Sequence, residues 1–192
     1  MCTFDDQGMT FVLFEAPVAE AVTDPPGFCV QCGVRAPLRF GHGFCYACFR
    51  AGYADHTINT ALGMVRGEDA ERGLTHGIPA AREDLEARGW EVVPHPVEPD
   101  FPDEQWFSVR VSAADLIELN RTPAYHTWQG EQWQFHCRRP MIYTGSFHGI
   151  PDDPEEQAAV EEMIGHPPSP HGSTYSFRCQ VCGARAAHHD SD

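Results

Sequence analysis

The chain has 192 residues, 42% of them hydrophobic, so it is long enough to bury one sizeable core. Its 28 Asp and Glu residues outnumber 13 basic residues, all of them Arg, and the formal net charge is −15. The average field of such a chain repels a phosphate backbone, which argues against nucleic acid and fits either a basic protein partner or plain solubility.

The pattern predicts an α+β fold, with a small mixed or antiparallel sheet, helices, and an N-terminal four-cysteine zinc-knuckle module at residues 27–52 of one domain that spans 1–192. In chain order we expect a strand at Phe11–Phe14, then the module, a helix at Pro79–Arg88, and strands at Trp90–Val93 and Gln105–Val111. A helix opened by the capping pattern Ser112-x-x-Asp115 follows, and then a helix at Trp128–Cys137 and a strand at Met141–Thr144. The chain is expected to end with a helix at Pro154–Ile164 and a strand at Tyr175–Arg178, followed by a polar tail.

No targeting or membrane signal is evident at the start of the chain. The first residues lack the basic and apolar regions of a secretory signal, and no apolar run approaches the length of a membrane span. We therefore expect a protein of the reducing cytoplasm. In that compartment eight cysteines, six of them in C-x-x-C pairs, are better explained by metal binding than by disulfides.

One complete metal-ligand pattern stands near the N-terminus, formed by Cys29, Cys32, Cys45 and Cys48. Two C-x-x-C pairs separated by twelve residues can each wrap one side of a zinc ion and complete a tetrahedron. Four thiolates leave no open position, so the site would be structural. An iron–sulfur cluster uses the same ligands, but two separated pairs flanked by glycine favour zinc. His42, between the pairs, is expected at the surface or beside the site and not as a ligand.

A second pair, Cys179 and Cys182, supplies half a site and needs two more donors from distant sequence. Cys137 is the obvious third ligand. His136 is predicted as the fourth, although adjacent residues share one ion only with awkward geometry, and His126 is an alternative. The tail histidines His188 and His189 are weaker candidates, and in the alternative without metal Cys137 is a small buried side chain.

The middle of the chain contains a run of residues that is similar to a known protein family. The run Arg121-Thr122-Pro123-x-Tyr125, then Trp128-Gln129-x-Glu131-x-Trp133, then His136-Cys137 resembles the signature of the CbrC family, bacterial proteins named for a link to colicin tolerance. The early and terminal C-x-x-C-G knuckles are also similar to that family, whereas residues 54–111 have no counterpart that we can place. The resemblance implies a zinc-binding protein associated with tolerance of a toxin or of envelope stress, and it implies no established biochemical activity.

Three classes of function follow. The leading one is a zinc-stabilised binding or interaction protein of the CbrC type, possibly a toxin-tolerance or stress factor, whose acidic face meets a basic partner. The alternative is a zinc-dependent hydrolase with an open site at Cys137, Cys179 and Cys182. A zinc-ribbon nucleic-acid binder is the third, and the charge opposes it. We predict no catalytic residue, because Glu131 and His136 would not share a helix face and no hydrolase motif is present. Arg121 and Glu131 are read instead as an ion pair.

Overall fold

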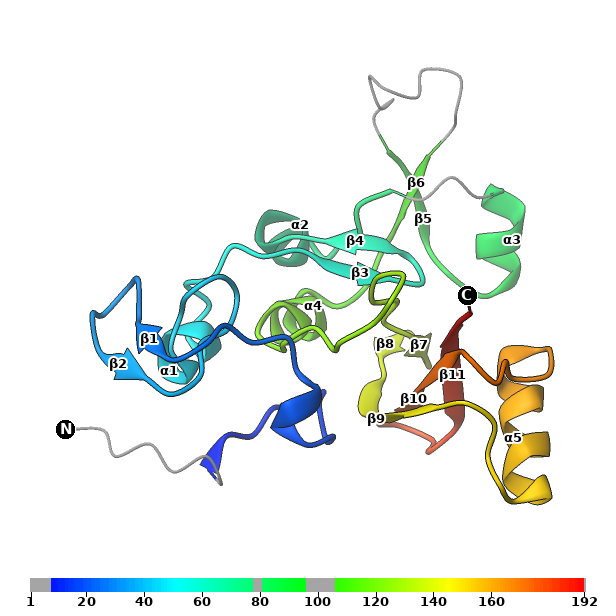
Figure 1. Cartoon of the computed structure of the whole chain (residues 1–192). Helices are drawn as coiled ribbons and strands as arrows, with labels where there is room; N and C mark the ends of the chain where they lie inside the picture. The colour runs from blue at the N-terminus through cyan, green and yellow to red at the C-terminus, as the bar shows by residue number, and fades with distance from the viewer. Residues whose placement is uncertain (1–7, 78–80, 96–105, 192) are drawn as a thin grey trace.

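The structure is a computed structural model that describes residues 8–77, 81–95 and 106–191 (Figure 1). Within those residues the chain forms short helices and small antiparallel sheets around one hydrophobic cluster. This confirms the predicted α+β class. No helix in the described part of the chain is both long and apolar enough to cross a membrane.

The N-terminal part is built from very short elements. After a 3-10 turn at Val18–Glu20, strands β1 (Gly27–Phe28) and β2 (Arg35–Ala36) form a hairpin, and helix α1 (Tyr46–Arg50) follows. The predicted strand at Phe11–Phe14 is not formed, because these residues make a tight turn with isolated bridges from Phe11 to Phe14 and from Phe14 to Tyr143. Phe11, Leu13 and Phe14 are buried all the same, whereas Val12 is 58% exposed, so most of this apolar run marks the core and not a strand.

The middle of the chain alternates hairpins with helices. It contains β3 (Ile58–Thr60), β4 (Gly63–Val65), α2 (Gly67–Arg72), α3 (Arg82–Ala87), β5 (Val92–Pro94), β6 (Phe107–Val109) and α4 (Ala113–Asn120). Helix α3 lies inside the predicted helix Pro79–Arg88, and β5 and β6 lie near the two predicted strands. Residues 79 and 80 of that helix, residue 105 of the second strand, and residues 96–103 between the two strands fall outside the described part. Ser112 takes the N-cap position of α4, but its side chain makes no capping hydrogen bond. The Asp115 N–H donates to the Ser112 carbonyl at 3.1 Å, and the Asp115 carboxylate binds Arg139.

The C-terminal part holds the largest sheet. It contains β7 (Phe135–His136), β8 (Arg139–Pro140), β9 (Ile142–His148), α5 (Pro154–Ile164), β10 (Ser173–Arg178) and β11 (Arg185–Asp190), with β9, β10 and β11 antiparallel in the order β11-β10-β9. Figure 1 shows α5 beside β11 at the edge of this sheet. The residues expected to form a polar tail are therefore strand β11, which pairs with β10 from Asp190 back to Arg185.

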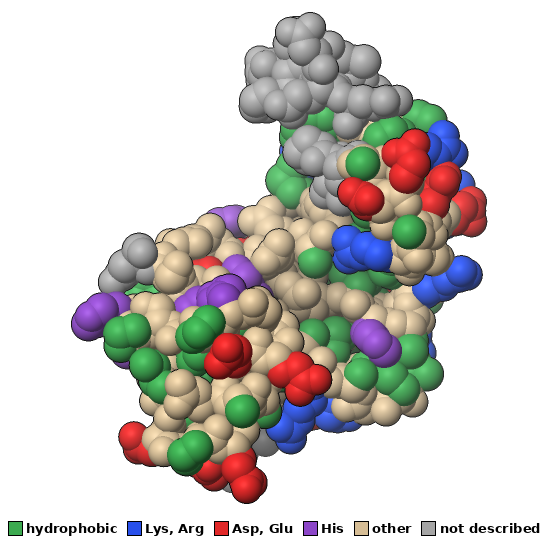
Figure 2. All heavy atoms as spheres, turned by 90° about the vertical axis from the view of Figure 1, so that its right-hand side faces the viewer, with side chains coloured by type: hydrophobic (Ala, Val, Ile, Leu, Met, Phe, Trp, Pro, Cys, Tyr) green, Lys and Arg blue, Asp and Glu red, His purple; other side chains and the backbone are tan. Residues whose placement is uncertain are grey.

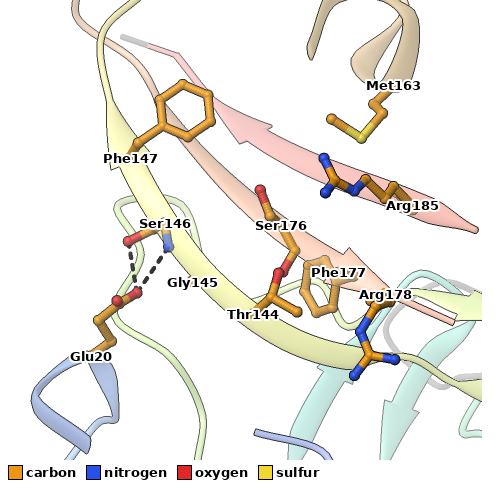
Figure 3. Close-up of a pocket in the computed structure, with 11 residues that line it drawn as sticks. Glu20, Thr144, Gly145, Ser146, Phe147, Met163, Ser176, Phe177, Arg178 and Arg185 are labelled. Atoms are coloured by element: carbon orange, nitrogen blue, oxygen red, sulfur yellow. Dashed lines mark hydrogen bonds between the residues drawn. The ribbon is translucent and has the colours of Figure 1, made fainter. Parts of the chain in front are cut away.

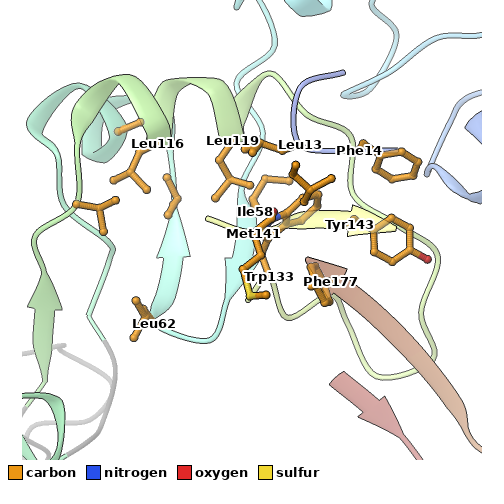
Figure 4. Close-up of a cluster of buried hydrophobic side chains, with 14 of the residues drawn as sticks. Leu13, Phe14, Ile58, Leu62, Leu116, Leu119, Trp133, Met141, Tyr143 and Phe177 are labelled. Atoms are coloured by element: carbon orange, nitrogen blue, oxygen red, sulfur yellow. The ribbon is translucent and has the colours of Figure 1, made fainter. Parts of the chain in front are cut away.

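The core lies where α4, the β3–β4 hairpin and the C-terminal sheet meet (Figure 4). Leu116 and Leu119 of α4 are fully buried and point into this cluster, and Trp133 is 0% exposed at its centre. The Trp133 indole N–H donates to the Met141 carbonyl at 2.8 Å. Tyr125 stacks on the ring of Tyr143 at 4.6 Å. A single aromatic cluster thus joins the middle of the chain to its C-terminal sheet.

The helix predicted at Trp128–Cys137 is wrong. Gly130 has a φ of 102°, and the backbone N–H of Trp133 donates to the carbonyl of Asn59 in β3, so the segment is extended and paired. Trp128 is consequently 80% exposed while Trp133 is buried. The expected ion pair between Arg121 and Glu131 is also replaced, because Glu131 accepts a hydrogen bond from the Asn59 N–H at 3.1 Å.

Candidate metal centres

The N-terminal cysteines are brought together by a hairpin and a helix start. Cys29 and Cys32 lie in the turn between β1 and β2, where the Cys29 N–H donates to the Val34 carbonyl at 2.8 Å. Cys45 occupies the N-cap position of α1 and Cys48 lies within that helix. The chain therefore offers one pair from a knuckle and one pair from a helical turn. The spacing predicts that the two pairs converge, but not that the second lies in a helix.

The geometry of this cluster fits a tetrahedral ion. The four sulfurs lie within 4.8 Å of one another, and the Sγ atoms of Cys32 and Cys45 are 3.8 Å apart. A Zn–S bond of roughly 2.3 Å gives a tetrahedral edge of about 3.8 Å. All four cysteines are free thiols, and a disulfide would need an S–S distance of about 2.05 Å. The donor set and its spacing therefore suit a metal and not a cystine.

Backbone groups of the module already favour a thiolate at Cys29. Burial raises the pKa of the Cys29 thiol, but hydrogen bonds from the backbones of Cys45, Cys32 and Gln31 outweigh burial and bring its pKa to about 6. Burial raises the pKa of the Cys48 thiol, and the neighbouring sulfurs add to this effect. A cation at the centre of the four sulfurs would compensate the charge that this crowding opposes.

The second cluster joins two hairpins that are distant in sequence. His136 and Cys137 lie at the tip of the β7–β8 hairpin, and Cys179 and Cys182 lie in the turn between β10 and β11. The Cys137 and Cys182 sulfurs are 3.7 Å apart, and the His136 Nδ1 atom is 3.3 Å from the Cys137 sulfur and 3.4 Å from the Cys182 sulfur. All four donor atoms lie within 4.8 Å of one another. The donor atoms of the adjacent residues His136 and Cys137 can therefore bind one ion together with Cys179 and Cys182.

A strained turn makes this juxtaposition possible. Cys137 and Arg138 have φ angles of 51° and 58° between the paired residues His136 and Arg139. A two-residue hairpin loop with both residues at positive φ is the type I′ pattern, which normally uses Asn and Gly. Residues other than Gly, Asn and Asp cost roughly 1–2 kcal/mol each when their backbone adopts this left-handed conformation. This conformation places the Cys137 thiol at the tip of the hairpin, 3.7 Å from the Cys182 sulfur.

The two knuckles have the same backbone design. In each, the glycine after the second cysteine has a positive φ, 71° at Gly33 and 76° at Gly183. Its N–H donates to the carbonyl of the first cysteine, at 2.9 Å and 3.1 Å respectively. In the second knuckle the Val181 N–H also points at the Cys179 sulfur at 3.4 Å. Such turns aim backbone N–H groups at thiolates. Any residue other than glycine at the position after the second cysteine would have a strained backbone, because its φ is positive.

The electrostatics of the second cluster parallel those of the first. Burial raises the pKa of the Cys179 thiol, but backbone hydrogen bonds from Cys182 and Val181 lower it to about 6. A hydrogen bond with Cys182 raises the pKa of Cys137 to about 11. The clusters differ in exposure, because three donors of the first are buried whereas only Cys179 of the second is.

Every sequence-predicted ligand lies in one of these two clusters, and whether the clusters bind metal stays a prediction. The weaker candidates His126, His188 and His189, like His42, lie outside both clusters. The ring of His188 instead contacts the Tyr125 hydroxyl at 3.3 Å, which places it on the sheet and not in a solvated tail. The sequence predicted His136 and Cys137 as ligands of one ion but placed them in a helix, so it missed the β7–β8 hairpin that presents both donor atoms.

A groove of about 500 Å³ runs along the C-terminal sheet beside the second cluster (Figure 3). Arg178 and Arg185 line it and are direct cross-strand partners, an unfavourable pairing of like charges. They flank the Cys179–Cys182 turn, so thiolates there would offset the repulsion, and Glu15 binds Arg178 at 2.6 Å. At the other end Glu20 accepts hydrogen bonds from the Ser146 N–H and hydroxyl. The charges of the groove are thus explained by neighbouring groups of the chain.

Comparison with known proteins identifies a family. Residues 39–162, about two thirds of the chain, match the model of an uncharacterised protein family, UPF0167. The match includes Cys45, Cys48, His136 and Cys137, whereas both C-x-x-C-G knuckles lie outside it. It spans residues 54–111, so the expectation that this segment departs from the family is wrong. No curated protein and no solved structure matches the chain. The chain belongs to UPF0167, the CbrC-type family that its sequence resembles.

Proposed function

We propose that this protein is a binding or interaction protein whose fold is held by two structural zinc ions. One ion is bound by Cys29, Cys32, Cys45 and Cys48, and the other by His136, Cys137, Cys179 and Cys182. The observation that carries the proposal is that each cluster supplies four donors within 4.8 Å of one another. Four protein donors fill a tetrahedral zinc site and leave no position for a reacting water.

Zinc is proposed because of the donor chemistry. Thiolate and imidazole ligands in tetrahedral sets suit zinc, whereas magnesium and calcium prefer oxygen ligands. The described cysteines are free thiols. The Sγ atoms of Cys32 and Cys45 are 3.8 Å apart, and those of Cys137 and Cys182 are 3.7 Å apart, as expected for two ligands of one zinc ion. An iron–sulfur cluster at the first site remains the competing occupant of four thiolates, and colour and iron content distinguish it.

The zinc-dependent hydrolase alternative requires an open position at Cys137, Cys179 and Cys182. The His136 Nδ1 atom lies where that position would be, 3.3 Å and 3.4 Å from two of the sulfurs. A carboxylate base beside the metal is also needed, and Glu131 is occupied with the Asn59 N–H. These contacts favour the structural assignment over catalysis.

The partner that we propose is a cationic protein. The formal charge of −15 attracts basic surfaces and repels nucleic acid. On the face drawn in Figure 2, arginines are scattered among acidic side chains and no continuous basic surface is visible. We propose cytoplasmic localisation because seven cysteines stand in sets suited to metal binding and not to disulfides, and a role in toxin tolerance or stress rests on the resemblance to the CbrC family alone.

We also propose that residues 1–192 form one domain, with the module at 27–52 as a part of it. One hydrophobic cluster contains buried side chains from Phe11 through Cys179. The bidentate ion pair from Arg50 in α1 to Glu118 in α4, at 2.8 Å and 3.2 Å, ties the module to the middle of the chain. These contacts support one folding unit.

Metal analysis of the full chain tests the proposal. Protein purified without added zinc should contain two zinc ions per chain, and Cys29→Ser and Cys179→Ser should each contain one. Cys2→Ser, which alters a cysteine of neither predicted ligand set, is the matched control and should keep two. X-ray absorption should give an average of 3.5 sulfurs and 0.5 nitrogens per zinc, since the two sites contribute four sulfurs and three sulfurs with one nitrogen. Unchanged metal content in both the Cys29→Ser and the Cys179→Ser variant, or an oxygen ligand in the wild-type spectrum, would refute the two-zinc proposal.

A further inference from the structure

A pocket of about 430 Å³ lies between the N-terminal module and the middle of the chain, and neither metal cluster uses it. Its walls come from residues 22–24, 41–42, 55–57 and 123–124 together with Phe49. Backbone hydrogen bonds fix two of these walls, from Val22 to Ala124 and from Asp24 to Arg39, each at 2.8 Å. The pocket is therefore a product of tertiary pairing, and its volume is within the ~300–1,000 Å³ of ligand sites.

Two side chains that line the pocket have buried polar atoms without hydrogen bonds. These are the Oδ2 atom of Asp24 and both ring nitrogens of His56, none of which has a partner of normal geometry among the described residues. Buried polar groups in proteins are nearly always satisfied, so each exception calls for an explanation. Burial lowers the pKa of His56, which the nearby Thr122 backbone only partly opposes, so its ring is neutral near pH 7 and does not repel a cation in the pocket.

The rim of the pocket is held in an unfavourable backbone conformation. Gly41, His42 and Gly43 follow one another with φ angles of 50°, 67° and 114°. Gly41 has no room for a side chain, since a Cβ there would lie 2.7 Å from the Cβ of Ala54. His42 has a side chain and pays for this conformation, which places it at the pocket mouth. Strain retained beside unsatisfied polar groups is typical of ligand sites.

The charge of the lining selects the ligand. Asp24 and Asp55 contribute carboxylates, and no described lining residue is Arg or Lys. The rings of Phe49 and His56 lie 5.1 Å apart at 38° and form an aromatic wall. A guanidinium suits these features, because it is planar, carries five N–H donors and no acceptor, and is weakly hydrated. An ammonium ion is more strongly hydrated and does not stack on such a wall.

We propose that this pocket binds the guanidinium group of an arginine side chain on a cationic protein partner. The proposal rests on the cationic partner of the proposed function and names its anchor. The guanidinium pairs with the Asp24 carboxylate and stacks on the wall formed by the rings of Phe49 and His56, and Asp55 at the exposed edge adds attraction. Arginine is also a frequent energetic anchor of protein interfaces.

Titration of the zinc-loaded full chain with short peptides tests this proposal. The ¹⁵N-labelled protein is titrated with acetyl-Gly-Arg-Gly-amide and with the citrulline peptide of the same length, in which an uncharged urea replaces the guanidinium. The arginine peptide should shift resonances of residues 22–24, 41–42 and 55–57, and the citrulline peptide should bind at least about tenfold more weakly. Equal binding of the two peptides, or shifts confined to other regions, overturns the assignment.

Variants localise the effect. Asp24→Asn and Asp55→Asn should each weaken binding of the arginine peptide, the first by about tenfold or more, and the exposed Asp152→Asn is the charge-matched control. If Asp24→Asn does not fold, Asp55→Asn decides. Binding of free L-arginine without binding of the peptide overturns a protein partner as the source. Zinc content is measured in every sample. Absence of arginine-peptide binding by a wild-type chain that holds two zinc ions therefore rejects this pocket and leaves the metal assignment intact.

Discussion

Replacement of His136 by Ala is the sharpest test of the second metal centre. The Nδ1 atom of His136 lies 3.3 Å from the Cys137 sulfur and 3.4 Å from the Cys182 sulfur, close to the N···S edge of about 3.5 Å that a tetrahedral zinc requires. Structural zinc sites bind with roughly 10–16 kcal/mol, so an equal share for one of four ligands is about 2.5–4 kcal/mol. Zinc affinity at this site should therefore fall by on the order of 10²- to 10³-fold.

Competition with a chromophoric zinc chelator measures this change. The wild-type chain should release its second zinc only at high chelator concentration, whereas His136→Ala should release one zinc per chain early and keep the other. His126→Ala is the matched control, because His126 is exposed and outside both clusters. Equal zinc retention by His136→Ala and His126→Ala would refute the closed site. That result would return weight to the hydrolase alternative, in which water is the fourth ligand.

Three further substitutions test the fold around the sites. Trp133→Ala empties a fully buried position and should cost about 3–5 kcal/mol in urea unfolding; a cost below ~1 kcal/mol would contradict its place in the core. Glu20→Gln weakens charged hydrogen bonds from Tyr143 and Ser146 and should cost about 1 kcal/mol by the same assay, with no change meaning that these bonds are not formed in solution. Arg138→Gly relieves a φ of 58° and should raise Tm by ~1–4 °C, whereas Arg66→Gly, at a φ of −107°, should not; equal effects would argue against the strained turn.

Elements with strong local signals could be predicted from the sequence. Helix α5 begins and ends where expected, because Asp153 caps its first turn, Pro154 fits the first helical position, and Gly165 takes the left-handed conformation at its end. The knuckles were predictable for a similar reason, since two cysteines and a following glycine encode their own turn. In both cases the residues that decide the structure lie within a few positions of one another.

Elements decided by distant pairing could not be predicted in this way. The segment with Trp128 and Trp133 has helix-forming residues, but its backbone pairs with Asn59 and its buried indole binds the Met141 carbonyl. Strand β11 has the composition of a solvated tail, and its conformation comes from pairing with β10. The type I′ turn at Cys137 has neither Asn nor Gly, so the usual hairpin signal is missing.

The two cysteine clusters relate to the hydrophobic core in different ways, and this difference decides what each metal would stabilise. Cys29, Cys45 and Cys48 form a small buried cluster with Ala36 that is separate from the main core. Phe40 and Phe49 anchor the module on the main core, so a metal there would chiefly order the four-cysteine cluster and the β1–β2 hairpin, which lie outside that core. Cys179 instead belongs to the main core. A metal bound there would join two hairpins at the edge of a core that is already packed, so its loss should loosen that edge while the aromatic centre around Trp133 persists.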